Sequence, residues 1–241
     1  MEKINDIEET YYQYNLVKNI PSFHKFILNR DNSIITEYNS NYYVLLLVNN
    51  SRFTNPIIIN SYGEVNWRKI WQEKSDYIES YYEHIRIQNP LVNESFDYYL
   101  GLLEFAIFYL GEDNYYGEIY IQQKKYDNDI NNPLNVVVDF KERNFAEYLK
   151  YLFISNEYKN IDMHNLIRKN KDNYNFDLVI ARVIYPNYYF DLLDDIIDND
   201  VDENILIDVI KRSDSFENYI NYLMNEISLI YPIKKIPFMR F

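Results

Sequence analysis

Glu118-Ile119-Tyr120-Ile121-Gln122-Gln123 and Asn135-Val136-Val137-Val138-Asp139-Phe140 are two apolar runs on either side of a polar loop, and they decide how the middle of the chain folds. Branched and aromatic residues dominate both runs, which predicts two short β-strands. Asp139 stands at the exit of the second strand, and Gln122 and Gln123 stand at the exit of the first. The strand ends therefore carry one acidic group and two neutral amides.

These groups bear on one kind of chemistry, phosphoryl transfer. A phosphotransferase needs a metal-binding Asp and a second Asp that orients the attacking hydroxyl group. Asp139 stands where the metal ligand belongs, but Gln122 and Gln123 occupy the place of the second Asp. An ionised carboxylate can take up the hydroxyl proton and an amide cannot. The sequence thus predicts a kinase-type architecture that lacks its reaction centre.

The composition limits the other classes of function. A chain of 241 residues with 47% hydrophobic content can form one large or two small domains with a buried core. A net charge of -13 argues against binding to nucleic acid or to an anionic membrane. The chain has no Cys, and His24, His84 and His164 lie far apart, which excludes a thiolate nucleophile and a zinc site.

Two features predict a cytosolic protein. The N-terminal residues 1–6 are charged and lack the apolar stretch of a secretory signal. The most apolar helix-like run, Tyr98–Leu110, contains Glu104 and is well short of the roughly 20 residues that span a bilayer. We therefore expect no membrane helix.

The first fifty residues predict a helix followed by a small antiparallel sheet. A rough helical stripe over residues 5–19 ends before Pro21. Three strand-like runs follow, and the turn-forming residues between them predict a three-stranded meander. The last run is apolar on both faces, so we expect it to be covered on both sides. The predicted strands are Phe23–Asn29, Ser33–Tyr38 and Tyr42–Val48, and a hinge is expected at Asn49-Asn50-Ser51.

Most of the remaining chain predicts helices. Apolar residues recur at three- and four-residue steps from Trp67 to Ile85, and Pro90 ends this stripe. A second long helix is expected from an N-cap at Asn93 to Gly111. Further helices are expected near residues 143–155, 161–172, 174–185 and 187–198, with two more before Pro232.

This order predicts an α+β, mostly helical fold of the protein-kinase-like class. Residues 1–50 would form a truncated small lobe, made of a helix and a three-stranded sheet. Residues 51–241 would form a helical large lobe with a two-strand insert at 118–140.

Two motifs carry a resemblance to a known family. They are Ser95-Phe96-Asp97-Tyr98-Tyr99-Leu100-Gly101-Leu102-Leu103-Glu104-Phe105-Ala106-Ile107 and Ala181-Arg182-Val183-Ile184-Tyr185-Pro186-Asn187-Tyr188-Tyr189-Phe190. Together with the paired Trp67 and Trp71, they resemble the spore-coat-associated kinase-like proteins of endospore-forming bacteria. That family is similar to aminoglycoside and choline phosphotransferases, and the likeness spans roughly residues 20–200.

The resemblance implies an active-site pattern that this chain does not keep. An active relative would have His-Gly-Asp after the first strand, where alignment on Gly117 places Ile121, Gln122 and Gln123. Asp139 would remain as one metal ligand, and Asn128, Asn131 or Asn132 could at best replace the second. One carboxylate and one amide would bind Mg²⁺ weakly.

The glycine-rich hairpin and lysine of a nucleotide-binding lobe are also missing. The four glycines, at 63, 101, 111 and 117, all follow the predicted small lobe. If residues 5–19 replace the regulatory helix of that lobe, Glu8 or Glu9 would be the partner of a lysine that the chain lacks. We expect neither ATP nor Mg²⁺ to bind tightly.

Each remaining candidate residue has a structural interpretation beside a functional one. Asp139 is a weak metal ligand or a cap for the helix that follows, through amides near Arg143. Arg182 and Glu104 are expected to form ion pairs, with each other or with Glu147. His164 is expected at the surface, and the acidic run from Asp191 to Glu203 is interpreted as a solvated helix face more readily than as a calcium site. Possible contacts to an anionic ligand are Lys124, Lys125 and Asn128.

These observations favour a catalytically inactive kinase-like protein that binds a protein partner or acts as a scaffold, and the resemblance implies an association with the spore coat. One alternative is a degenerate phosphotransferase for a small hydroxyl- or amine-bearing substrate, which would use Asp139 with Asp127 or Asp129 as base. Another is a structural coat component that exploits the 27 tyrosines.

Overall fold

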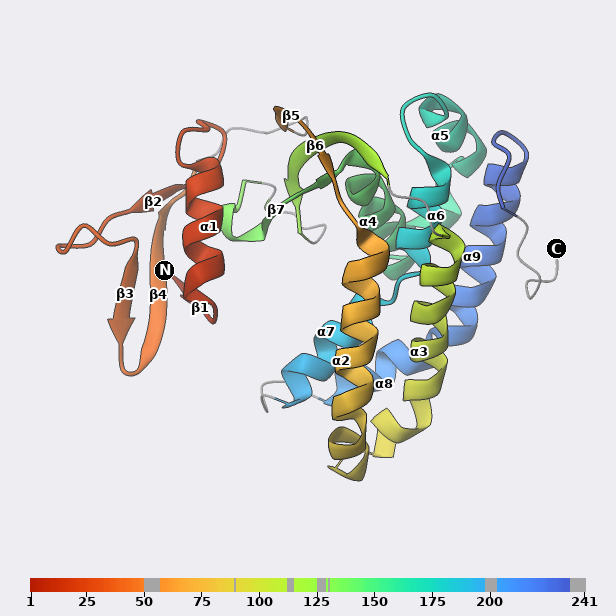
Figure 1. Cartoon of the computed structure of the whole chain (residues 1–241), viewed down its shortest axis with the longest axis horizontal. Helices are drawn as coiled ribbons and strands as arrows, with labels where there is room; N and C mark the ends of the chain where they lie inside the picture. Colours follow the sequence, from red (N-terminus) through yellow and green to blue (C-terminus); the bar gives the residue numbers. More distant parts are fainter. Residues whose placement is uncertain are drawn as a thin grey trace. The chain divides into compact units, whose positions relative to one another are not determined.

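The chain folds as an α+β protein in which helices predominate (Figure 1). The computed structural model describes residues 1–49, 57–88, 90–111, 115–124, 129, 131–197 and 203–234. Two compact units are present. Unit 1 comprises Met1–Gly63 and Gly117–Asn144, and unit 2 comprises Glu64–Tyr116 and Phe145–Phe241. The strand pair that the sequence placed in the large lobe thus groups with the N-terminal residues.

Unit 1 begins with a four-stranded antiparallel sheet in which β4 is central. β1 pairs with residues 42–44 of β4 along one edge, and β3 pairs with residues 41–44 along the other. β2 lies opposite β1 and pairs with residues 45–47 of β4. The strands are β1 (Glu2–Ile4), β2 (Lys25–Ile27), β3 (Ile35–Tyr38) and β4 (Asn41–Leu47).

The predicted three-stranded meander is therefore wrong, because β2 and β3 follow each other along one edge of β4 and β1 adds a fourth strand. A loop closed by Asn29 explains this arrangement. Asn29 Oδ1 accepts hydrogen bonds from the backbone N–H groups of Asp31 and Ser33, both at 2.9 Å. The backbone N–H of Asn29 donates to the carbonyl of Ser33 at 2.8 Å. These bonds turn the chain back, so that β3 pairs with the same edge of β4 as β2 does.

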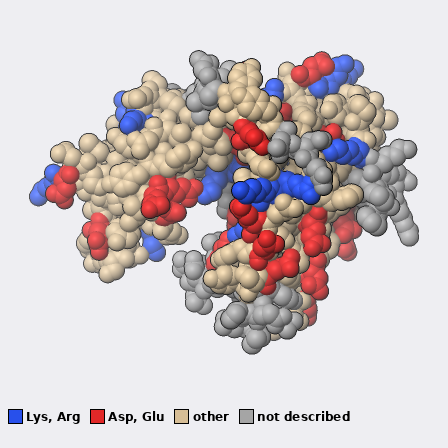
Figure 2. Space-filling view, viewed as in Figure 1, with Lys and Arg blue, Asp and Glu red and all other residues tan. Residues whose placement is uncertain are grey.

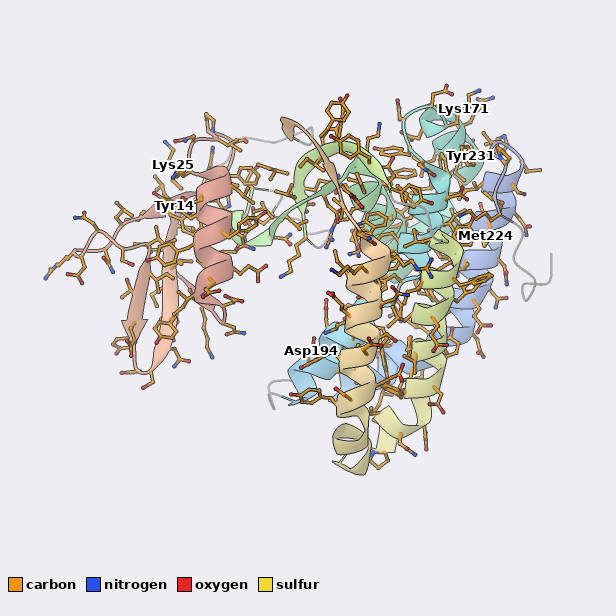
Figure 3. The ribbon with its side chains drawn as sticks, viewed as in Figure 1. Tyr14, Lys25, Lys171, Asp194, Met224 and Tyr231 are labelled. Atoms are coloured by element: carbon orange, nitrogen blue, oxygen red, sulfur yellow. The ribbon has the colours of Figure 1, made fainter. Side chains whose placement is uncertain are left out.

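Helix α1 (Ile7–Val17) confirms the helix predicted over residues 5–19. Asp6 caps it by accepting a hydrogen bond from the Glu9 N–H at 2.8 Å. Tyr14 of α1 packs edge-to-face on Phe26 of β2, with 5.4 Å between ring centroids (Figure 3). Phe26 lies on the same face of the sheet as the buried Val44, so α1 covers that face.

A second sheet, in the order β5-β6-β7, completes unit 1. β6 (Tyr116–Gln123) and β7 (Val136–Phe140) pair antiparallel, which confirms the two predicted strands. β5 (Ile57–Glu64) is a third strand that the sequence analysis did not predict. A Cβ atom on Gly63 would lie 3.3 Å from the Ile119 side chain, so β5 approaches β6 closely at this residue.

The helices of unit 2 follow the prediction within a few residues. α3 begins at Pro90, three residues before the expected cap, because proline suits the first turn of a helix. Gly111 ends α3 in the left-handed conformation, with φ of 74°. The helices are α2 (Trp67–Gln88), α3 (Pro90–Leu110), α4 (Lys141–Ile154, of which 141–144 belong to unit 1), α5 (Met163–Asn170), α6 (Phe176–Ile184), α7 (Asn187–Ile197), α8 (Glu203–Lys211) and α9 (Ser213–Ser228).

The core of unit 2 is built around α6, in which every residue except Asp177 is buried. Aromatic rings connect α2 to the segment that follows α6. Trp67 stacks on Trp71, and Trp71 stacks on Tyr185 at 4.5 Å. No helix within the described ranges is both long and apolar enough to cross a bilayer.

We expect alkaline pH to weaken this core. Tyr99 stacks on Tyr189 at 3.8 Å, and its burial raises its pKa from 10.0 to about 12. Burial also raises the pKa values of Tyr109 and Tyr219. The folded state holds these phenols neutral, so their contribution is complete below pH 10.0 and is lost as the pH rises toward 12. Urea unfolding across this range should show a falling free energy of unfolding, and appearance of tyrosinate absorbance without loss of stability would contradict the expectation.

Candidate functional site

The predicted site residues lie together where β6, β7 and α4 meet in unit 1. Ile121, Gln122 and Gln123 end β6, and Asp139 is the penultimate residue of β7. The strand register pairs Tyr120 with Asp139. The structure thus brings together the positions that the sequence singled out.

Ile121, at the position of the expected histidine, is a core residue. It is 5% exposed and belongs to a hydrophobic cluster with Val17, Phe23 and Val136. Its aliphatic side chain provides packing between α1 and the second sheet and offers no polar atom for catalysis.

Gln122 connects β6 to the beginning of α4 through both ends of its amide. Its Nε2 donates to the backbone carbonyls of Asp139 and Phe140, at 2.6 and 2.5 Å. Its Oε1 accepts from the Asn144 N–H at 3.0 Å. The side chain is buried, and a carboxylate could not replace it because it has no donor for the two carbonyls.

Asp139 is held by the protein itself. Its Oδ1 accepts from the Phe140 N–H at 2.8 Å, and its Oδ2 pairs with Arg143 Nη1 at 3.0 Å. Arg143 Nη2 donates a hydrogen bond to the backbone carbonyl of Lys124 at 3.1 Å. Both partners are largely buried, so a neighbouring cation neutralises the carboxylate. The sequence analysis expected a helix cap through backbone amides near Arg143, and the structure instead pairs Asp139 with the Arg143 guanidinium. Its role as a metal ligand stays a prediction, and no cluster of three or more potential metal ligands occurs within the described residues.

Gln123 and Lys124 lie beside this pair. The Nε2 of Gln123 is buried and has no hydrogen-bond partner among the residues that the structure describes. Lys124 Nζ contacts Glu9 of α1 at 2.7 Å. Lys124 follows β6 and is not the small-lobe strand lysine that the sequence analysis found missing. The two side chains are 44% and 39% exposed, and the pair contributes at most about 1 kcal/mol. Lys125, Asp127 and Asn128 lie outside the described residues.

A hydrogen-bonded triad at the edge of unit 1 was not predicted. His24 Nε2 lies 3.0 Å from Asp129, and His24 Nδ1 accepts from the Asn49 N–H at 3.0 Å. This places the ring proton on Nε2 and occupies both nitrogens. The contact is structural, and no local pattern indicated it, because His24 and Asp129 are 105 positions apart.

Hydrogen bonds shift two pKa values at the other end of β6. Tyr120 donates to Glu118 at 2.6 Å, and Tyr62 of β5 donates to the same carboxylate at 3.2 Å. These bonds lower the pKa of Glu118, while the bond to Glu118 raises the pKa of Tyr120 to about 12. The carboxylate therefore stays ionised at neutral pH and is not a proton donor.

In unit 2 a buried ion pair occupies the second sequence motif. Arg182 Nε lies 2.9 Å from Glu147 Oε1, with side-chain exposures of 5% and 7%. Lys150 approaches Glu147 at 3.6 Å, and the Arg182 guanidinium lies 5.2 Å from the centre of the Tyr185 ring. This confirms Glu147 as one of the expected partners of Arg182, whereas Glu104 is exposed.

The other charged candidates of unit 2 are at the surface. The side chain of His164 is 45% exposed and lies 3.3 Å from Glu226, as expected for a surface residue. Asp194 of the acidic run pairs with Lys74 of α2 at 2.7 Å (Figure 3). The part of that run beyond Ile197 and before Glu203 is outside the described residues.

Unit 2 also contains an apolar groove of about 250 Å³ that the sequence analysis missed. Lys150 lies at this groove and donates to the Tyr185 carbonyl at 2.9 Å and to Asn187 Oδ1. Six aromatic residues line the groove: Tyr99, Phe153, Tyr185, Tyr188, Tyr189 and Phe216. The second motif thus provides packing and part of a groove.

Comparison with known proteins gives two matches. A family model described as "Spore coat putative kinase YutH" matches residues 49–223. The "Endospore coat-associated protein YutH" of Bacillus subtilis (strain 168) is 22% identical over 275 aligned positions, which cover 92% of this chain and 76% of that protein. No solved structure matches.

Replacement of Gln122 should destabilise unit 1. Gln122→Ala removes three buried hydrogen bonds and should cost about 2 to 3 kcal/mol. In Gln122→Glu, burial and the facing carbonyls would raise the pKa of the new carboxyl, so the loss should be larger at pH 7 than near pH 4. Urea unfolding measures the stability of both Gln122 variants. Gln123→Glu is the control for a new charge at the neighbouring residue. Unchanged stability in Gln122→Ala would contradict the assigned role.

Breaking the Glu147–Arg182 ion pair should also destabilise the protein. Glu147→Ala leaves a buried guanidinium without its carboxylate and should cost about 3 to 5 kcal/mol. Glu104→Ala is the matched control, because Glu104 is exposed and its removal should change stability by less than about 0.5 kcal/mol. Thermal and urea unfolding would show this difference, and equal effects of the two substitutions would refute it.

Proposed function

The chain belongs to the spore coat YutH family, and from this membership we propose that it is a catalytically inactive, kinase-like binding protein of the spore coat. The family match and the curated relative support the association with the coat. Inactivity and a binding role are argued from the residues of the site.

This proposal rests on the hydrogen bonds that Gln122 and Asp139 make within the protein. Phosphoryl transfer depends almost entirely on charges positioned around the phosphate. Here the amide of Gln122 bonds to three backbone groups, and both oxygens of Asp139 have protein partners. Release of either side chain toward a ligand would break contacts that are buried.

The order of elements supports a kinase-like origin for the fold. A helix beside a small antiparallel sheet precedes two long helices, a strand pair and a helical C-terminal part. In this proposal β6 and β7 correspond to the strands that flank a catalytic loop, and Ile121, Gln122 and Gln123 replace the reactive residues. ATP and Mg²⁺ would then not bind tightly, and a protein would be the partner.

One alternative has an observation in its favour. Asp129 is 45% exposed and lies between β6 and β7, where a base could stand. A degenerate phosphotransferase could pair it with Asp139 for a small hydroxyl- or amine-bearing substrate. Its contact with His24 argues against this role, since the carboxylate already accepts a hydrogen bond from a buried ring.

Nucleotide binding separates the two proposals. With millimolar ATP and Mg²⁺, we expect no rise in the melting temperature of the wild-type protein, because only a ligand that binds the folded state stabilises it. Asp139→Asn should respond to nucleotide as the wild type does, with the exposed Asp208→Asn as control for a surface substitution. A rise that Asp139→Asn abolishes and Asp208→Asn retains, together with release of ADP, would favour the enzyme.

A further inference from the structure

Apolar side chains are open to solvent in both units. On the four-stranded sheet of unit 1, Leu45 and Leu47 of β4 are 47% and 58% exposed, so the expectation that β4 is covered on both sides is wrong. No feature of this face indicates what would cover it. In unit 2 the open apolar residues instead line the groove of about 250 Å³, and the charges at that groove indicate what it binds.

The rim of the groove leaves large apolar side chains uncovered. Ile154 at the end of α4, Tyr188 of α7 and Ile205 of α8 line the groove and are 47%, 44% and 41% exposed. A concave apolar surface with a few polar groups is typical of a ligand site. Its volume of about 250 Å³ is below the roughly 300–1,000 Å³ of most ligand pockets, so the occupant is a small molecule or a single side chain.

The walls of the groove favour an aromatic occupant. Tyr99 stacks on Tyr189 with 3.8 Å between ring centroids, and Phe153 packs on Phe216 at 5.2 Å. The hydroxyl of Tyr99 donates to the Val209 carbonyl at 3.0 Å, which fixes this ring between α3 and α8. Rings held in place in this way offer a further ring stacked and edge-to-face contacts, which add to the effect of the buried area.

Three charged residues line the groove within the described part of the chain, and one of them is already neutralised. Lys150 Nζ lies 3.6 Å from Glu147 Oε1. It also donates to the Tyr185 carbonyl at 2.9 Å and to Asn187 Oδ1. An ammonium group has three donors, so the protein itself satisfies Lys150. The other two charged residues are of opposite sign.

These two residues, Asp208 and Arg212, are exposed at the rim and stand four positions apart. Arg212 Nη1 donates to the backbone carbonyl of Ile154 at 3.1 Å, which holds the guanidinium beside the groove. A guanidinium has five N–H donors, so this contact leaves others for an anion. Neither residue forms an ion pair with the other or with any other residue that the structure describes. The rim therefore offers one anion and one cation to a ligand.

We propose that the groove binds a free α-amino acid with an aromatic side chain. The ring would lie against the aromatic walls, the ammonium group would pair with Asp208, and the carboxylate would pair with Arg212. This inference goes beyond the protein-binding role proposed above and does not depend on it, because it concerns a small molecule and a site within unit 2.

Charge disfavours other occupants of this size. A ligand with a carboxylate alone would bring it near Asp208, and a ligand with an amine alone would bring it near Arg212. Figure 2 shows acidic side chains over the helical unit, whose sequence has 26 Asp and Glu against 15 Lys and Arg, so a net anion would also be repelled. An uncharged side chain of a protein partner would leave both rim charges unmatched. A zwitterion matches both and has no net charge.

Calorimetric titration of the whole chain tests the class of ligand. L-tryptophan and L-phenylalanine are the probes, and the tighter of them should bind with a Kd of about 1 mM or lower. Indole-3-propionate lacks the ammonium group of L-tryptophan, and tryptamine lacks its carboxylate. Each should bind at least about fivefold more weakly than L-tryptophan, because it loses one charge-assisted hydrogen bond at an exposed rim.

A fifth compound separates a free amino acid from a protein side chain. N-acetyl-L-tryptophanamide has the ring of L-tryptophan without either charge, and stands for a tryptophan within a partner protein. It should bind at least about fivefold more weakly than L-tryptophan. Equal affinity for the two compounds, or no binding of either free amino acid, would overturn the proposal.

Two substitutions test the assignment of each charge. Asp208→Asn should weaken L-tryptophan binding and should not weaken binding of indole-3-propionate, which has no ammonium group. Arg212→Gln should weaken L-tryptophan binding and not tryptamine binding, and its amide still offers a donor to the Ile154 carbonyl. Asp172→Asn and Lys171→Gln are the matched controls at exposed residues outside the groove. An equal loss for L-tryptophan and for the analogue would show a purely structural effect and would overturn the assignment.

A third substitution tests the location of the site. Ile205→Trp places a large ring at an exposed position of the rim and should abolish binding of all five compounds, while circular dichroism checks that the variant is folded. Unchanged binding would place the site elsewhere and refute the inference. Nucleotide is not a ligand of this groove, so Asp208→Asn remains a surface control for the ATP experiment. Amino-acid binding and the absence of ATP binding can therefore each fail without the other.

Discussion

The amide of Gln122 sets the constraint on which the centre of unit 1 depends. It offers donors to two carbonyls at the end of β7 and an acceptor to the first turn of α4, so the strand pair and the helix are held in one geometry. Asp139 and Arg143 take their positions from that geometry. A side chain that performs this task cannot also be a base, because a base needs a free carboxylate and this place requires a donor. Structural support and phosphoryl chemistry exclude each other at this residue.

Residue identity and periodicity were enough to predict much of the fold. The helices of unit 2 follow apolar stripes, and the β6–β7 pair follows two branched runs, because both signals are local. The sequence analysis missed β1 and β5. Each forms by pairing with a strand that is distant in the chain, and local sequence patterns do not indicate such pairing. The predicted meander failed for the same reason, since the side chain of Asn29, not the turn residues alone, directs the chain back to β4.

At the candidate site, the sequence predicted which groups are present but not what they contact. The absence of an acidic residue at Gln123 could be read directly. The ion pair of Lys124 with Glu9 joins residues 115 positions apart, and the contact of His24 with Asp129 spans 105. Such contacts depend on how α1 and the two sheets pack, which a pattern of residue types does not encode. The motifs that carry the family resemblance proved to be packing elements, as the stack of Trp71 on Tyr185 shows.

The loop closed by Asn29 has a consequence for how the chain can vary. β2 and β3 each pair with β4 and not with each other, so the residues between them do not determine the strand register. Insertions or deletions in this loop would leave both strands where they are, provided that the chain still returns to the same edge. Relatives can therefore differ in length here while the sheet, and any surface it presents, is preserved.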